Sequence, residues 1–325
     1  MDRRRFLLTS VAGTLAAPLA ASAERAGKVY RIGYLDPSYL SFGEATLLET
    51  ALRERGWVKQ RDYVIETRWA DNKPESLTKF ASELLRWQPN LLLARGTEAA
   101  TAASRATREI PIVFTEVADP VGAGLVTTLA RPGANVTGLA STAGEAAAKQ
   151  LDLLREMVPR LSVIEVLWVR MSQPDAAVWK ELQATGHRLR ITLRSTVVAD
   201  QAGLQRALNS LSQGPPAAAL VYADEFAGSY LMTLAKFGIR QRLPMASNVP
   251  LLTWEGGLMS YSRSLREEWE RTADYVVRIR DGARPADLPV RRADVFQLLL
   301  NKTTAKALGL TIPPSLLALA DQVIE

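Results

Sequence analysis

The chain has 325 residues, of which 47% are hydrophobic and 23% are charged, so it can form two globular domains of ordinary composition. It contains no cysteine and a single histidine, His187, which excludes disulfides, thiol nucleophiles and metal sites built from cysteine or histidine clusters. The net charge of +6 is modest and basic residues alternate with acidic ones, so a nucleic-acid-binding surface is not indicated. We also expect no cofactor.

Residues 1–23 have the three parts of a secretory signal peptide: a basic start, an apolar stretch and the small-residue end Ala-Ser-Ala at 21–23. The run Arg-Arg-Arg-Phe-Leu at 3–7 also fits a twin-arginine signal, although ordinary Sec export accepts the same start. The apolar stretch is interrupted by glycine and proline and is short for a bilayer span, which disfavours a membrane anchor. We expect cleavage near Ala23 and a soluble, periplasmic mature chain that begins near Glu24.

The rest of the chain alternates short β-rich runs with helical runs, in two successive cycles. In the first cycle we expect strands at 30–35, 63–69, 90–94, 110–114 and 136–140, with helices at 44–55, 77–87 and 98–106. In the second we expect strands at 163–169, 191–198, 217–222, 244–247 and 257–261, with helices at 147–157, 176–189, 202–211 and 228–237. Strands separated by helices of this length predict right-handed βαβ units and parallel sheets.

A long tail follows the second cycle, with a helix at 265–280 and a β-like run at 295–300. Such a tail suggests that the chain returns to the first lobe and crosses again, which forms a multi-strand hinge. We therefore predict an α/β protein with two Rossmann-like lobes: residues 28–141 with about 263–291, and residues 142–262 with about 292–325. A cleft between hinged lobes is where a ligand is expected.

Several sequence motifs resemble those of the ABC transporter substrate-binding protein family typified by the tryptophan-binding lipoprotein of Gram-positive bacteria. They include Arg-Ile-Gly-Tyr-Leu at 31–35, Leu-Arg-Glu-Arg-Gly-Trp-Val at 52–58, Ile-Glu-Thr-Arg-Trp-Ala at 65–70, Ile-Pro-Ile-Val-Phe at 110–114, Asp-Pro-Val at 119–121, Arg-Pro-Gly-Ala-Asn-Val-Thr-Gly at 131–138, Gly-Gly-Leu-Met-Ser-Tyr at 256–261, Pro-Ala-Asp-Leu-Pro-Val at 285–290 and the run 302–317. Each motif alone is weak, and together they are highly specific and cover nearly the whole chain.

The resemblance implies a periplasmic binding protein type I fold that holds a small solute between its lobes. It also implies that the protein is not an enzyme. It also implies an ABC permease and its cytoplasmic ATPase as partners of a monomeric binding protein. Amino acids and other small carboxylates are the ligand class that the resemblance suggests. Glu98, Glu225 and the segment 169–174 depart from the usual family pattern in places prone to line a pocket.

In open parallel sheets, ligands bind beyond the carboxyl ends of the strands. The candidate ligand-binding residues at these ends are Asp36, Ser38, Gly96, Thr97 and Glu116 in the first lobe, and Tyr222, Asp224 and Asn248 in the second. Gly96 and Thr97 open a helix, where free N–H groups and the helix dipole can hold a carboxylate. Thr97 and Ser38 can equally act as helix N-caps, and Asp224 can either cap a helix or accept hydrogen bonds from a ligand. Tyr222 can stack on a planar ligand or serve only in packing.

Two other classes of protein share this scaffold. An enzyme is disfavoured because the sequence has no nucleophile elbow, phosphate loop or dinucleotide-binding fingerprint. A ligand-sensing protein that feeds a signalling receptor stays open as the alternative to a transport component.

Overall fold

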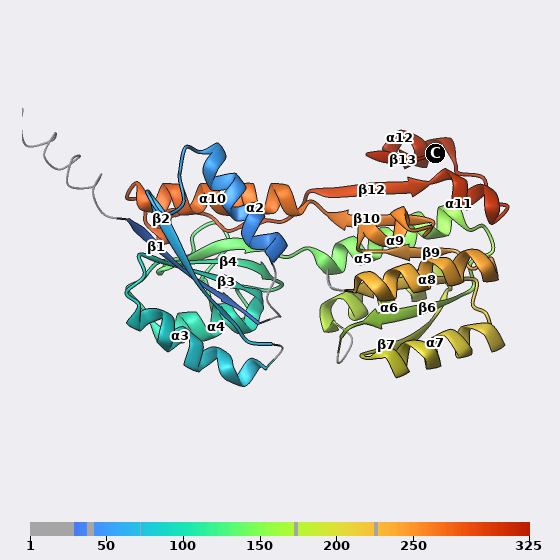
Figure 1. The fold of residues 1–325 in the computed structure, drawn as a ribbon, viewed down its shortest axis with the longest axis horizontal. Helices are drawn as coiled ribbons and strands as arrows, with labels where there is room; N and C mark the ends of the chain where they lie inside the picture. The colour runs from blue at the N-terminus through green and yellow to red at the C-terminus, as the bar shows by residue number, and fades with distance from the viewer. Residues whose placement is uncertain (1–28, 38–41, 72, 172–174, 224–226) are drawn as a thin grey trace, which may run out of the picture. The chain divides into compact units, whose positions relative to one another are not determined.

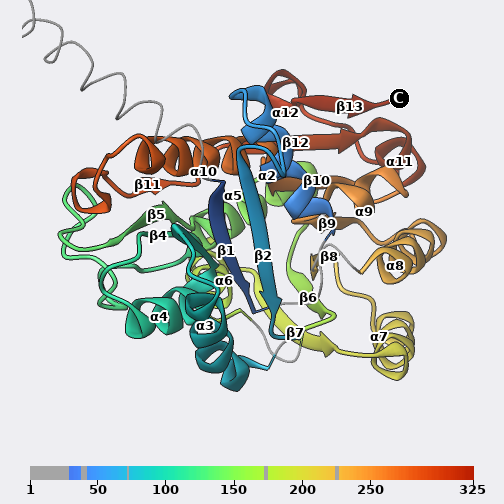
Figure 2. The ribbon, with the colours of Figure 1, turned by 60° about the vertical axis from the view of Figure 1, so that its left-hand side comes forward.

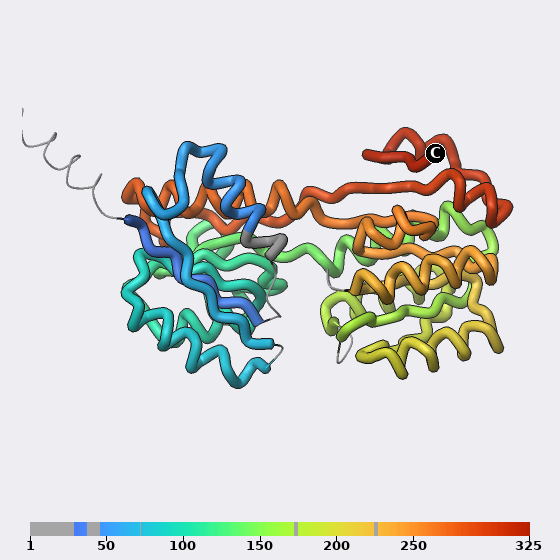
Figure 3. The backbone as a smooth tube through the Cα atoms, in the orientation of Figure 1, coloured from blue at the N-terminus to red at the C-terminus, as the bar shows by residue number. Residues whose placement is uncertain are grey.

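The computed structural model describes residues 29–37, 42–71, 73–171, 175–223 and 227–325 (Figures 1 and 3). The expected signal peptide therefore lies outside the described residues. The chain divides into two compact units and passes between them three times. Unit 1 comprises the chain up to Ala140 together with Trp269–Arg291. Unit 2 comprises Ser141–Glu268 and Arg292–Glu325.

Unit 1 is built on a six-stranded sheet in the order β11-β5-β4-β3-β1-β2. The strands are β1 (Tyr30–Asp36), β2 (Tyr63–Trp69), β3 (Leu91–Arg95), β4 (Ile112–Val117), β5 (Val136–Ala140) and β11 (Arg291–Arg292). The pairs of β1 with β2 and β3, and of β4 with β3 and β5, are all parallel. The carboxyl ends of β1, β3 and β4 therefore meet at one edge of the sheet.

Helices cover both faces of this sheet. α3 (Leu77–Arg86) and α4 (Gly96–Ala106) pack on one face, and α2 (Phe42–Glu54) and α10 (Leu265–Arg280) pack on the other (Figure 1). The run of leucines in β3 serves both faces, because alternate side chains of a strand point in opposite directions. Leu92 belongs to the core under α3 and α4, whereas Leu91 and Leu93 belong to the core under α2 and α10.

Unit 2 is built on a seven-stranded sheet in the order β13-β12-β10-β9-β8-β6-β7. Its strands are β6 (Val163–Val169), β7 (Thr192–Val198), β8 (Ala218–Ala223), β9 (Met245–Ser247), β10 (Met259–Arg263), β12 (Phe296–Asn301) and β13 (Gln322–Ile324). Its helices are α5 (Ala143–Met157), α6 (Ala176–Leu189), α7 (Gln201–Gln213), α8 (Gly228–Gln241), α9 (Pro250–Trp254), α11 (Lys302–Ala307) and α12 (Pro314–Leu319). Alternation along β6 again feeds two cores, with Trp168 on the α5 side and Leu167 on the α7 side.

The predicted fold class is confirmed, with differences in detail. The pair β10–β12 is antiparallel, so the sheet of unit 2 is mixed instead of wholly parallel. β4 was expected at 110–114 and instead occupies Ile112–Val117, and α4 begins at Gly96, two residues before its expected start. No helix among the described residues is long and apolar enough to cross a bilayer.

Candidate functional site

Three charged side chains meet at the carboxyl ends of β1, β3 and β4. Arg95, the last residue of β3, donates from Nε to Asp36 Oδ2 at 3.0 Å and from Nη1 to the two carboxylate oxygens of Glu116 at 3.1 and 3.2 Å. β3 lies between β1 and β4 in the sheet, so three neighbouring strands bring these residues to one edge. We call Asp36, Arg95 and Glu116 the charged cluster.

Asp36 is the buried member of the charged cluster, with 0% of its surface exposed. Besides Arg95, the hydroxyl of Tyr34 donates to Asp36 Oδ2 at 2.7 Å. A carboxylate removed from water is tolerated only when it is paired and hydrogen-bonded. Arg95 and Tyr34 meet that requirement, so Asp36 fixes the position of the Arg95 guanidinium.

Glu116 is presented by an irregular strand. The register between β4 and β5 shifts between Phe114 and Val117, and Glu116 has a left-handed φ of 57°. A non-glycine residue in this conformation costs on the order of 1–3 kcal/mol, and such residues cluster at functional sites. The side chain of Glu116 keeps 25% of its surface exposed, so it is the member of the charged cluster with most access to solvent.

Gly138 of β5 permits this irregularity. Its φ is 152°, and a Cβ placed on it would lie 2.0 Å from the carbonyl oxygen of Phe114. Only glycine allows the two backbones to approach this closely. The bulge that directs Glu116 towards Arg95 therefore depends on glycine at residue 138.

Thr97 lies inside the first turn of α4 and does not cap it. Arg95 occupies the N-cap position and its side chain makes no capping hydrogen bond, while Gly96 adopts a φ of 77° as the strand turns into the helix. The Thr97 side chain is exposed. The first-turn N–H groups lack acceptors within a helix, so this end of α4 favours negative charge beside the charged cluster.

In unit 2, two of the predicted residues have structural partners. Asn248 accepts from the backbone N–H of Ala223 at 3.0 Å and donates back to its carbonyl at 3.3 Å, which fixes the end of β8. Tyr222 is 5% exposed, stacks on Trp168 with ring centroids 5.1 Å apart and donates its hydroxyl to Gln150 at 2.7 Å. Its ring therefore belongs to the packed core of unit 2, and burial raises the pKa of the Tyr222 phenol.

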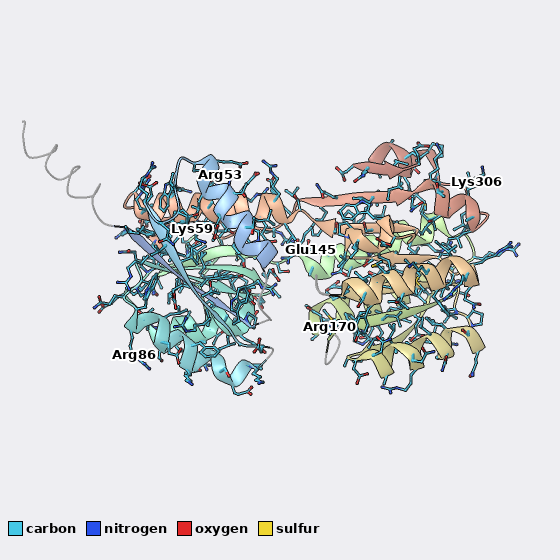
Figure 4. All side chains as sticks on the ribbon, viewed as in Figure 1. Arg53, Lys59, Arg86, Glu145, Arg170 and Lys306 are labelled. Carbon is cyan, nitrogen blue, oxygen red and sulfur yellow. The ribbon has the colours of Figure 1, made fainter. Side chains whose placement is uncertain are left out.

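Arg170 follows β6 at the same edge of this sheet (Figure 4). It has a left-handed φ of 64°, and its guanidinium lies 6.0 Å from the ring centroid of Tyr230. Ser38, Asp224 and Glu225, which the sequence placed at neighbouring strand ends, lie outside the described residues. Among the residues that the structure does describe, no group of three or more His, Cys, Asp or Glu side chains is arranged to hold a metal ion.

Counted over the described residues, the charged cluster brings two carboxylates to one guanidinium and so has one more negative than positive charge. It suits a ligand group that donates hydrogen bonds and carries positive charge, such as an ammonium. The adjacent end of α4 suits a negatively charged group. One edge of the sheet can therefore bind a positively charged group and a negatively charged group at neighbouring positions.

Arg95 belongs to this site but is not among the predicted ligand-binding residues. A signal for it exists in the sequence. A charged residue that directly follows the apolar run Leu91-Leu92-Leu93-Ala94 must find a partner where the buried strand ends.

One family model matches most of this chain. The model of the family described as ABC transporter substrate binding protein matches residues 45–324. The tyrosine-binding protein of Clostridioides difficile (strain R20291) is 24% identical over 260 residues, which cover 80% of this chain and 74% of that protein.

Solved structures agree on the fold. The ABC domain in complex with L-Trp from Streptococcus pneumonia has a TM-score of 0.74 at 24% identity, and the match covers 91% of this chain and 100% of that one. A conserved domain protein from Vibrio cholerae has a TM-score of 0.75 at 25% identity, with the same shares covered. The ligand-free, open structure of a substrate binding protein with adhesive properties from Clostridium difficile has a TM-score of 0.65 at 24% identity, covering 91% of this chain and 99% of that one.

Proposed function

We propose that this chain, which belongs to the ABC transporter substrate binding protein family, captures an amino acid outside the cytoplasm and delivers it to an ABC importer. The partners in this proposal are the permease and its cytoplasmic ATPase. The charged cluster beside the first turn of α4 is the main observation that supports an amino acid as the ligand.

An α-amino acid carries an ammonium and a carboxylate on one carbon atom. The charged cluster supplies carboxylate oxygens for the ammonium, and Glu116 is its more accessible member. The first turn of α4, which contains Gly96 and Thr97, supplies N–H groups and the Thr97 hydroxyl for the carboxylate. The similarity to a tyrosine-binding protein and to an ABC domain solved in complex with L-Trp supports the same ligand class.

Export is the second part of the proposal. Residues 1–23 carry the features of a signal peptide, with a twin-arginine-like start, and cleavage near Ala23 would release a periplasmic binding protein. Intact-mass measurement of the periplasmic fraction tests this directly. A product that keeps its first 23 residues and stays in the membrane would contradict it.

A thermal-shift screen of the mature chain tests the ligand class. A ligand that binds only the folded state raises the unfolding temperature according to its concentration relative to its dissociation constant. We expect one or a few L-amino acids to raise it, and the Glu116→Gln variant to reduce that shift. If sugars or polyamines stabilise the protein and no amino acid does, the proposed ligand class is wrong.

A further inference from the structure

Unit 1 has a pocket whose lining includes no member of the charged cluster. It is a cavity of about 200 Å³ bordered by the end of α2, the outer face of α10 and β11. Figure 2 shows β11 running beside α10, and the Tyr275 hydroxyl of α10 donates to the carbonyl of Pro289, two residues before β11. The polar residues that line the pocket are Arg55, Arg271, Asp274, Tyr275, Arg278 and Arg291.

The lining is strongly basic. Asp274 is the single acidic residue among the described lining residues, and it accepts a hydrogen bond from Arg55 Nε at 2.7 Å. The charges of that pair cancel, which leaves the guanidinium groups of Arg278 and Arg291 in excess within the described lining, where Arg271 also lies. Within the described part of the chain, no hydrogen bond or ion pair engages the side chains of Arg278 and Arg291.

These arginines converge on one place. Arg271, Asp274, Tyr275 and Arg278 follow helical spacing along one stripe of α10, and Arg291 arrives from β11. Burial raises the pKa of the Tyr275 phenol, and the charges of Arg291 and Arg278 both act on it in the opposite direction. Arg278 and Arg291 line the same pocket as Tyr275.

A helix often carries arginine in its last turn, where positive charge complements the helix dipole. This accounts for Arg278, which is in the last turn of α10. It does not account for Arg291, which lies on a different element. Positive charges that line one pocket repel one another, and an anion bound in the pocket offsets that repulsion.

We propose that this pocket binds a small, multiply charged oxyanion of the phosphate type. Planar guanidinium groups donate paired hydrogen bonds that match phosphate oxygens, which a lysine pocket would not do. The volume of about 200 Å³ lies below the roughly 300–1,000 Å³ of pockets that hold drug-sized ligands, so the pocket fits a single oxyanion group. The group belongs either to a free ion or to the headgroup of an anionic lipid.

Calorimetric titration with inorganic phosphate at constant ionic strength tests the proposal. We expect Arg278→Gln and Arg291→Gln each to weaken phosphate binding at least about tenfold, because each removes a charged hydrogen-bond donor. Gln has nearly the helix propensity of Arg, so Arg278→Gln should leave the fold intact, as its melting temperature without phosphate will report. Arg278→Lys should restore part of the affinity, since it returns the charge without the planar fork.

Arg86→Gln is the matched control, because Arg86 is an exposed arginine in the last turn of α3, also in unit 1 (Figure 4). Co-sedimentation with vesicles separates the two sources of the oxyanion. Binding to phosphatidylglycerol vesicles that is lost in Arg278→Gln assigns the group to a lipid headgroup, and phosphate binding without vesicle binding assigns it to a free ion. If the protein binds neither, or if Arg86→Gln weakens binding as much as Arg278→Gln, the proposal is wrong.

Discussion

Replacing Asp36 by asparagine should destabilise unit 1 and leave the rest of the chain unaffected. The Asp36 carboxylate is fully buried and is shared by Arg95 Nε at 3.0 Å and the Tyr34 hydroxyl at 2.7 Å. Removing one partner of a buried ion pair costs about 3–5 kcal/mol, because the remaining charge loses its compensation. Arg95 is 18% exposed and keeps Glu116, so we expect the lower end of that range, about 3 kcal/mol.

Urea and thermal unfolding of the mature chain measure this cost. For a domain of this size, each kcal/mol lowers the melting temperature by about 2–4 °C, so Asp36→Asn should lower it by about 6–12 °C. Asp287→Asn is the matched control, because Asp287 pairs with Arg284 at 2.7 Å while both side chains are more than half exposed, so it should have no measurable effect. An Asp36→Asn variant as stable as Asp287→Asn would refute the reasoning that the buried carboxylate fixes Arg95.

Three further changes have distinct expected outcomes. Thr97→Ala should weaken amino-acid binding about tenfold in calorimetric titration. It should cost little stability, because Thr97 does not cap α4. An unchanged dissociation constant would show that Thr97 does not contact the ligand. Gly138→Ala should lower the free energy of unfolding by about 3 kcal/mol in urea titration, because its Cβ would overlap the backbone of Phe114, and a variant as stable as the parent would contradict the close approach. Burial raises the pKa of Tyr30 and of Tyr63 from 10.0 to about 12, so the stability from these neutral phenols is complete below pH 10 and is lost as pH rises to about 12. Urea midpoints measured across that interval should fall, and Tyr63→Phe should make the fall shallower.

Much of the fold follows from hydrophobic patterning alone. β2, β6, α6 and α10 have the bounds that their sequence patterns predict, because each carries an uninterrupted strand or helix period. The resemblance to the substrate-binding family is likewise confirmed. Short elements without a full period, namely α9, α11, α12 and β13, were not predicted.

The charged cluster shows where sequence reasoning stops. Asp36 and Glu116 were identified from their positions after buried strands, but Arg95 joins them across separations of 59 and 21 residues. Those contacts depend on strand order, which local patterns do not determine. The bounds of β4 were missed for a related reason, since a bulge carries the strand past Phe114 to include the charged Glu116.

In the proposed function, the charged cluster binds the ammonium of an amino acid. Calorimetric titration of the parent protein and of Glu116→Gln with L-tyrosine, L-tryptophan and their deaminated analogues tests it most directly. We expect the parent to bind an intact amino acid at least about tenfold more tightly than its deaminated analogue, and Glu116→Gln to lose most of that difference. Equal affinity of the parent for an amino acid and its deaminated analogue would contradict the claim.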